Sequence, residues 1–468
     1  MQRWSGLVVG CFLTFWGTSP VLTQDSNTGI PPTDLAIRLN ELEAEVKQLR
    51  AITENQTIVP ASHESDSTSP SYCVPPKEPD FPTVKMTGFF QTDLGWINQD
   101  FVNRATLGDI QDGWDFRRAR LAAGGNVTED VSYLIEMDFA QLQPWFVDVW
   151  MDFANVGNVM NVRIGRFRQP FGMTELNSIR ELPFLERPLL FGLAPFRQTG
   201  IMAYGNDDKD NSNLTWAASG YRYLSDNFGN VYADNGGWGL AMRGTLLPIY
   251  QNDGRQLFHL GADYSFNDPG RDLVFYANAP EFVQGQNPAL GPAGLDKLPI
   301  SAITPFVNTG AMPTDRTHLF NLEAAGGVGN LYVQSEVRWA VVDRQNGQKS
   351  ETFPGAYAHA RYILTGEKLP YKRASGLFGR VVPDNPVKFG GGGGIGAWEL
   401  ATRLSWLDLN GTNLPGPGRD LTNVTFGLNW YLNRYTKFQF NYINANLDDP
   451  RLGRSDANIY AVRGQIDF

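Results

Sequence analysis

Arginine is concentrated in one short part of the chain, between Asn161 and Gly200. This part holds six arginines, three glutamates and no lysine: Arg163, Arg166, Arg168, Arg180, Arg187 and Arg197, with Glu175, Glu181 and Glu186. Guanidinium groups stay charged and offer forked donors that match phosphate oxygens. The pattern therefore predicts a track for small anions. The alternative is that the glutamates neutralise the arginines, which then only fasten the segment to its surroundings.

The segments around these arginines alternate between apolar and polar residues, as β-strands do when one side is apolar and the other wet. In the first such segment, Val84, Met86, Gly88, Phe90, Leu94 and Trp96 share a face opposite Lys85, Thr87, Gln91 and Asp93. In a later one, Val147, Val149, Met151 and Phe153 oppose Asp148, Trp150 and Asp152. Carboxylates that recur on one face need water, which the lumen of a membrane β-barrel supplies.

This alternation places further arginines on the wet side. Arg118 and Arg120 lie on the face opposite Leu121, and Arg163 shares a face with Asn161 and Gly165. The candidate residues for an anion pathway are therefore Arg118, Arg120, Arg163, Arg180, Arg187 and Arg197. The last strand repeats the pattern, since Tyr460, Val462, Gly464, Ile466 and Phe468 alternate with Ala461, Arg463, Gln465 and Asp467.

The pattern predicts an all-β fold, a transmembrane antiparallel barrel of about sixteen strands. The strands should begin near residues 83, 115, 131, 145, 159, 198, 212, 237, 256, 315, 329, 354, 396, 420, 435 and 456. A barrel of this size leaves an open channel. With an even count and both ends in the periplasm, residues about 168–197 and 268–314 become long external loops. Residues about 365–395 fit poorly, because they are long where a short periplasmic turn belongs. Either they form a structured insert or the count is wrong there by an even number.

Three segments precede the barrel predicted for residues 83–468. Residues 1–23 have the positive start and short apolar core of a secretory signal. Residues 33–53 carry Leu35, Leu39, Leu42, Val46 and Leu49 at heptad spacing, which predicts a short coiled-coil helix. Residues 54–82 are rich in Ser, Pro and charge, as linkers are. If Cys11 is removed with the signal, Cys73 has no partner for an intrachain disulfide.

Other classes of protein find little support. The net charge of −10 argues against nucleic-acid binding. The four histidines are scattered without metal-ligand spacing, and the glycine run 391–396 precedes a strand instead of joining a strand to a helix, so neither a metal nor a cofactor is expected. No motif supports an enzyme; an outer-membrane hydrolase would need a paired Ser and His. The mean hydropathy of −0.29 resembles that of a soluble protein, but a barrel shows lipid only every second residue.

An ordered series of motifs along the barrel resembles the phosphate-selective porin O and P family. It includes Phe116-Arg117-Arg118-Ala119-Arg120-Leu121, Gly165-Arg166-Phe167-Arg168-Gln169-Pro170-Phe171-Gly172, Glu186-Arg187, Arg197-Gln198-Thr199-Gly200, Leu364-Thr365-Gly366-Glu367, Gly396-Ala397-Trp398-Glu399-Leu400-Ala401-Thr402-Arg403 and Gly427-Leu428-Asn429-Trp430-Tyr431. The resemblance implies a homotrimeric sixteen-stranded outer-membrane porin with a loop folded into its lumen. It also implies passage of small anions, phosphate being the best-known substrate.

The sequence thus predicts a passive channel for small anions, phosphate or polyphosphate, with outer-membrane lipid around it and the N-terminal helix in the periplasm. Two features weaken a phosphate preference. The arginine-rich segment 161–200, which is expected to narrow the lumen, lacks lysine, and Asp138, Asp148 and Asp152 are expected in the lumen. One alternative is a general porin without ion preference. Another is a structural tether that joins the outer membrane to peptidoglycan through the N-terminal helix.

Overall fold

The computed structural model describes residues 81–140, 144–208, 211–223, 236–282 and 305–468. The predicted signal (1–23), the predicted helix (33–53) and all but the last two residues of the predicted linker (54–82) lie outside these ranges. Within the described ranges, no helix combines the length and the apolar character needed to cross a membrane.

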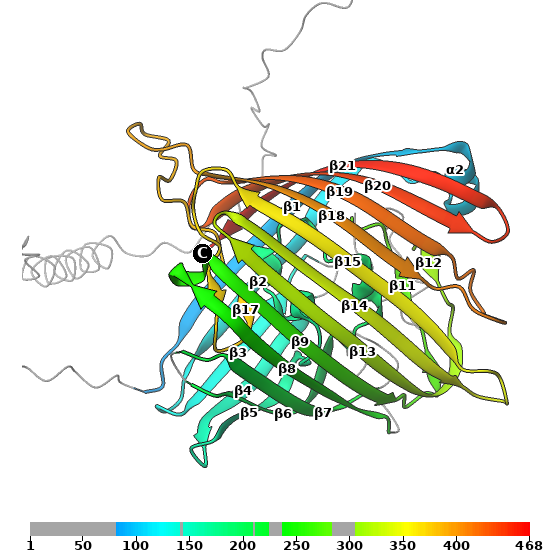
Figure 1. Cartoon of the computed structure of the whole chain (residues 1–468), viewed down its shortest axis with the longest axis horizontal. Coiled ribbons are helices and arrows are strands. Elements are labelled where there is room, and N and C mark those ends of the chain that lie inside the picture. The colour runs from blue at the N-terminus through cyan, green and yellow to red at the C-terminus, as the bar shows by residue number, and fades with distance from the viewer. Residues whose placement is uncertain (1–80, 141–143, 209–210, 224–235, 283–304) are drawn as a thin grey trace, which may run out of the picture. The chain divides into compact units, whose positions relative to one another are not determined.

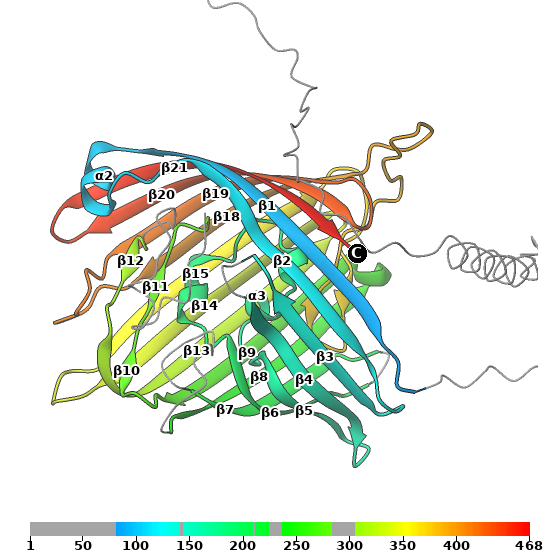
Figure 2. The same cartoon turned by 180° about the vertical axis from the view of Figure 1, so that it is seen from behind.

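Sixteen antiparallel strands form a closed barrel (Figures 1 and 2). They are β1 (Lys85–Gln99), β2 (Gly113–Asn126), β3 (Val131–Asp138), β4 (Trp145–Val156), β5 (Met160–Arg168), β6 (Arg197–Asn206), β7 (Leu214–Arg222), β8 (Trp238–Gln251), β9 (Gln256–Asp268), β13 (Met312–Val328), β14 (Leu331–Arg344), β15 (Glu351–Ile363), β18 (Ala397–Asp408), β19 (Asp420–Tyr431), β20 (Thr436–Asp449) and β21 (Gly453–Asp467). Closure comes from β1, which pairs with both β2 and β21. We call the end where β1 begins and β21 ends the terminal mouth, and the opposite end the far mouth.

Short elements occupy the connections between barrel strands. Helices are α2 (Phe101–Leu107), α3 (Met173–Leu176) and the 3₁₀ turns η1 (Ile179–Glu181), η2 (Leu189–Leu193) and η3 (Asn252–Gly254). Two-residue strands are β10 (Leu273–Val274), which pairs with β13, and the pairs β11 (Ala277–Asn278) with β12 (Val307–Asn308) and β16 (Tyr371–Lys372) with β17 (Leu377–Phe378).

The predicted strands are confirmed, and each begins within three residues of its expected start. The misfit at 365–395 is resolved as well. Because β15 pairs directly with β18, the strand count is right, and residues 364–396 are a structured insert that contains the β16–β17 hairpin. This insert joins its two strands at the terminal mouth.

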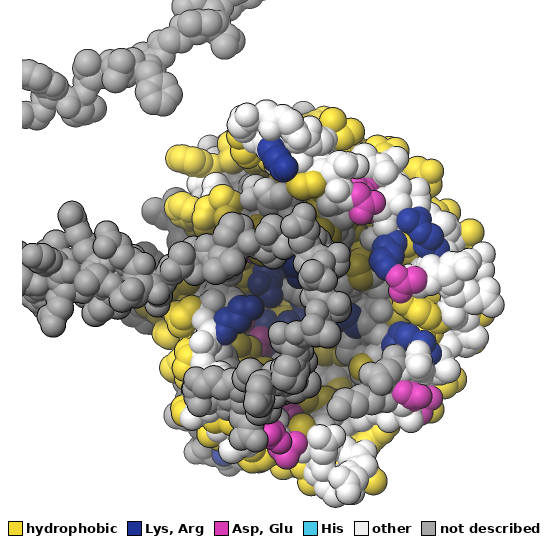
Figure 3. Space-filling view, turned by 90° about the vertical axis from the view of Figure 1, so that its left-hand side faces the viewer, with side chains coloured by type: hydrophobic (Ala, Val, Ile, Leu, Met, Phe, Trp, Pro, Cys, Tyr) yellow, Lys and Arg dark blue, Asp and Glu magenta, His cyan; other side chains and the backbone are white. Residues whose placement is uncertain are grey.

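Burial in the barrel is the reverse of burial in a soluble protein. Large apolar side chains such as Leu322 and Leu404 are each 55% exposed on the outer face, whereas Arg338, Glu399 and Arg463 are fully buried inside. Figure 3, which faces the terminal mouth, shows basic side chains within the opening and apolar side chains around the outside. Lipid satisfies the outer face, and charge pairing satisfies the inner one.

One strand departs from strict alternation. Val147 was expected to face outward with Val149 and Met151, and this prediction is wrong, since Val147 is buried beside Asp148. The cause is a β-bulge: Ile135 pairs with Val149 but Met137 pairs with Phe146, so β4 carries one extra residue. A bulge turns two successive side chains toward the same face of a sheet.

The outward face can be tested with a charge at mid-height. Because lipid cannot solvate a guanidinium, Leu322→Arg should destabilise the barrel by about 2–4 kcal/mol. Urea unfolding in phospholipid vesicles measures this, with Leu322→Ala as the control for lost packing. An unchanged free energy of unfolding for Leu322→Arg would mean that Leu322 does not face lipid.

Candidate functional site: an arginine-lined cavity

Three segments fold inward and occupy much of the lumen. The loop 169–196 carries α3, η1 and η2 down from the far mouth, and α3 is visible inside the barrel in Figure 2. The segment around β11 packs on this loop, because Asn278 Nδ2 donates to the carbonyl of Leu189 at 2.6 Å. The insert 364–396 closes in from the terminal mouth, where Arg380 forms an ion pair with Glu181 of η1 at 2.9 Å.

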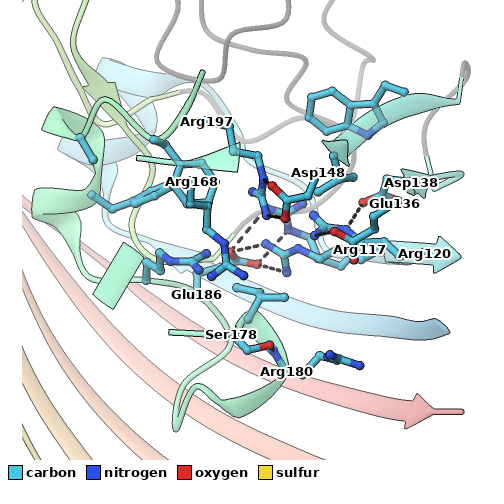
Figure 4. Close-up of a pocket in the computed structure, with 18 of the residues that line it drawn as sticks. Arg117, Arg120, Glu136, Asp138, Asp148, Arg168, Ser178, Arg180, Glu186 and Arg197 are labelled. Carbon is cyan, nitrogen blue, oxygen red and sulfur yellow. Dashed lines mark hydrogen bonds and ion pairs between the residues drawn. The ribbon is translucent and has the colours of Figure 1, made fainter. Parts of the chain in front are cut away.

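Between the first two of these segments and the wall of β1–β5 lies a cavity of about 300 Å³. Its charged lining contains eight arginines and five carboxylates: Arg117, Arg118, Arg120, Arg166, Arg168, Arg180, Arg187 and Arg197, with Glu136, Asp138, Asp148, Glu186 and Glu281. Figure 4 shows five of them, Arg117 and Arg120 of β2, Arg168 of β5, Arg180 of the loop and Arg197 of β6. The cavity therefore has an excess of positive charge although the chain as a whole is acidic.

Glu186 is the centre of the charge network. Its carboxylate accepts from Arg117 Nε at 2.8 Å, Arg118 Nη2 at 2.9 Å and Arg463 Nη2 at 3.0 Å. Arg463 also pairs with Asp93 at 2.6 Å. Burial alone would raise the pKa of the Glu186 carboxyl, but the three guanidiniums hold that pKa well below its ordinary value. Glu186 thus remains ionised and fastens the loop to β2 and β21.

Arg117 and Arg118 reach the same carboxylate because of a second β-bulge. Gln91 pairs with Arg118 but Thr92 pairs with Phe116, which leaves Arg117 without a cross-strand partner. Sequence alternation alone sends Arg117 outward, and its inward position was therefore missed. The adjacent pair of arginines was the available signal, since a charged residue on a lipid face is costly.

Within the described part of the chain, Arg168 and Arg187 bind neutral acceptors and form no ion pair with a carboxylate. Arg187 donates to the carbonyls of Thr174, Glu175 and Asn177, and Arg168 donates to those of Glu175, Leu176 and Asn177, all at 2.8–3.2 Å. Carbonyl partners orient a guanidinium without cancelling its charge. Burial, together with the charges of Arg168 and Arg197, lowers the pKa of Arg187 well below its ordinary value. An anion in the cavity would relieve this repulsion.

The other candidate residues divide into paired and unpaired groups. Arg197 binds Asp148 through two contacts at 3.0 and 3.1 Å, and Arg120 binds Asp138 at 2.8 Å. Arg163 pairs with Asp152 and lies over the Trp150 ring at 4.1 Å, outside the cavity lining. Arg180 lines the cavity 5.4 Å from the Phe89 ring and forms no ion pair with a carboxylate among the described residues.

The proposed neutralising glutamates have partners that differ from the expected ones. Only Glu186 pairs with a candidate arginine; Glu175 pairs with Arg338 of β14 at 2.7 Å and Glu181 with Arg380 of the insert. Gly172 permits the contact between Glu175 and Arg338. Its φ is 76°, and a Cβ there would lie 1.8 Å from Glu175 Oε2. Among the described residues, no group of three or more His, Cys, Asp or Glu could hold a metal ion.

A family model described as phosphate-selective porin O and P matches residues 84–468, the whole barrel. The chain belongs to this family. It is accordingly an outer-membrane porin, a channel and not an enzyme. The arginines described above therefore line the lumen of a porin, inside a barrel that the family model covers from β1 to the last residue.

Individual proteins resemble the chain at lower identity. Porin O of Pseudomonas aeruginosa is 24% identical over 413 residues, which cover 82% of this chain and 88% of that protein. An uncharacterized protein of Caulobacter vibrioides is 25% identical over 405 residues, which cover 82% of this chain and 74% of that protein. Among solved structures, an anion-selective porin from Comamonas acidovorans has a TM-score of 0.48 at 11% identity, covering 82% of this chain and 99% of that chain.

The network at Glu186 makes the loop sensitive to acid. The folded-state pKa of Glu186 lies below its ordinary value of 4.5, so its ion pairs are complete above that pH and are lost as the pH falls through the folded-state pKa. We expect steady single-channel current from neutral pH down through the ordinary carboxyl range, and larger current fluctuations only in more acidic solution, as the pH falls through the lowered pKa of Glu186. Glu186→Gln should fluctuate at every pH, because it leaves buried guanidiniums without their anion.

Glu129, which is exposed in the turn between β2 and β3, provides the control. Glu129→Gln should behave as the unsubstituted channel across the same pH series. Steady current from Glu186→Gln at neutral pH would show that the carboxylate does not hold the loop.

Proposed function

We infer that this porin passes small anions, phosphate or polyphosphate among them, and that the arginines of the cavity select them. The observation that carries the proposal is the positive charge left uncancelled in a narrow section: Arg168 and Arg187 are bound by carbonyls, and Arg180 has no carboxylate contact in the described residues. Charge that lines a narrow section is what gives a pore its ion preference.

We propose different roles for the arginines of the cavity. Arg118, Arg120 and Arg197 are paired with carboxylates, so they contribute less net field and more rigidity. Arg168 and Arg187 combine both roles, since they hold the loop and keep their charge. Arg180 is the candidate whose charge is available to a passing anion. Phosphate fits this arrangement because several guanidiniums can share its oxygens.

The matched pair Arg180→Gln and Arg163→Gln tests the proposal. Both changes remove one positive charge from the lumen side, but only Arg180 lines the cavity. Arg180→Gln should lower the anion-to-cation permeability ratio by about twofold or more, and should weaken block by added phosphate. Arg163→Gln should change neither. Reversal potentials in planar bilayers under a salt gradient, with and without phosphate, give both quantities.

Equal ratios for the two variants, or no block of the unsubstituted channel by phosphate, would instead favour a general porin without ion preference.

We also propose that residues 33–53 form a periplasmic helix that helps to join three copies of the chain. The heptad spacing of Leu35, Leu39, Leu42, Val46 and Leu49 supports this assembly. Deleting 33–53 should lower the temperature at which the oligomer dissociates in mild detergent, with replacement of these five residues by Ser giving the same shift. An oligomer of unchanged heat resistance would remove the helix from the assembly.

A further inference from the structure

The insert 364–396 lies at the terminal mouth and is fastened to strands and turns several places away along the barrel wall. Tyr371 shares a hydrogen bond of 2.7 Å with His259 Nδ1 of β9. Arg243 of β8 donates to the carbonyls of Ser375 and Gly376, each at 3.1 Å. Since the insert leaves β15 and returns to β18, these contacts carry it past the ends of β13 and β14. Figure 1 shows β17 within the barrel outline.

Apolar packing and further polar contacts add to this attachment. Leu369, Tyr371, Phe378 and Val381 of the insert belong to one buried cluster with Met173 of the inward loop. Arg373 donates to the turn between β6 and β7, at Ser212 O (2.9 Å) and Asn213 Oδ1 (2.7 Å). The insert is thus a fixed part of the lumen. It meets the loop 169–196, which we call the constriction loop, from the side of the terminal mouth.

Arg380 is the point where the insert reaches the loop by an ion pair. Its Nε lies 2.9 Å from Glu181 Oε2, its Nη1 donates to the carbonyl of Arg434 at 2.7 Å, and its Nη2 pairs with Asp467. One guanidinium therefore joins η1 of the loop, the turn between β19 and β20, and the last strand. Its side chain is 20% exposed, so solvent screens these pairs only in part.

Glu181 is the neighbour of Arg180 in the three-residue turn η1. The barrel wall contacts this part of the loop at backbone carbonyls: Gln465 binds that of Arg180 at 3.4 Å, and Gln439 binds that of Leu182 at 3.1 Å. Arg380 instead forms an ion pair with the side chain of Glu181. A side chain held at one position of so short a turn restrains the backbone of the adjacent residue, from which the Arg180 side chain projects.

We propose that the insert braces the constriction loop, with Arg380 as a positioning residue that holds Glu181 and thereby aims Arg180 into the anion pathway. The selectivity part of this proposal rests on the proposed function. The brace itself is a statement about the loop, and current fluctuations report on it whichever ions pass. Arg380 contributes through Glu181, and no contact with the permeating anion is required of it.

The variant Glu181→Gln separates positioning from simple electrostatics by the sign of its effect. It removes a negative charge near the pathway, so electrostatics alone would raise the anion-to-cation permeability ratio. If Glu181 positions Arg180, the ratio should fall by about twofold or more and open-channel noise should rise. Arg380→Lys keeps the charge but loses the planar fork, and should behave as Arg380→Met does.

Two comparisons complete the experiment. Lys388→Met removes a positive charge from an exposed position of the same insert, away from the contacts described above, and should leave the permeability ratio and the noise unchanged. The double variant Glu181→Gln/Arg380→Met should show no larger effect than the larger single change, because both single changes remove the same contact between Glu181 and Arg380. Single-channel recording reads only channels that have folded and inserted.

The proposal is overturned if Glu181→Gln raises the ratio while Arg380→Lys matches the unsubstituted channel, or if the two single effects add. If the unsubstituted channel has no anion preference, the proposed function fails. The open-channel noise then tests by itself whether the insert holds the loop. Higher noise in Glu181→Gln and Arg380→Met than in Lys388→Met then supports it, and equal noise in all three rejects it.

Discussion

The contact between Glu186 and three guanidiniums is the interaction on which the arrangement of the lumen depends. Its carboxylate meets Arg117 and Arg118 of β2 and Arg463 of β21, while Arg463 is itself held by Asp93 of β1. The loop is therefore anchored at the seam where the barrel closes. Removing a charge from such a buried network is costly, because the partners left behind stay desolvated. The same contacts thus hold the loop in position and join the two strands that close the wall.

The two sides of the lumen neutralise charge differently. Under α3, the wall of β9, β13 and β14 is rich in carboxylates, with Asp263, Glu323 and Glu336 buried around Arg338 and Arg243. Glu175 of the loop adds its own carboxylate to Arg338, so the loop packs against this side of the lumen through a buried ion pair. On the side of β1–β5, guanidiniums outnumber carboxylates around an open cavity. The loop covers the acidic wall and leaves the basic one lining the cavity, so an acidic protein contains a cavity with excess positive charge.

Alternation of apolar and polar residues was sufficient to predict the barrel, its sixteen strands and the inward faces of Arg118 and Arg120, because lipid and water impose a period of two along every strand. It failed at Arg117 and Val147, where a bulge adds a residue and reverses the faces. It also could not supply the partners of Glu175 and Glu181. Those partners, Arg338 and Arg380, lie 163 and 199 residues away in sequence, and only the path of the folded loop brings them together.

The contact between Glu186 and Arg463 also imposes an order on barrel assembly. The two residues are separated by 277 positions, and Arg463 belongs to the last strand. A partly built barrel can hold the loop by β2 but lacks the third guanidinium and the Asp93–Arg463 pair. The constriction can therefore reach its final form only when the seam closes. A barrel that lacks its last strand would lack these contacts, so closure of the wall and final placement of the loop coincide.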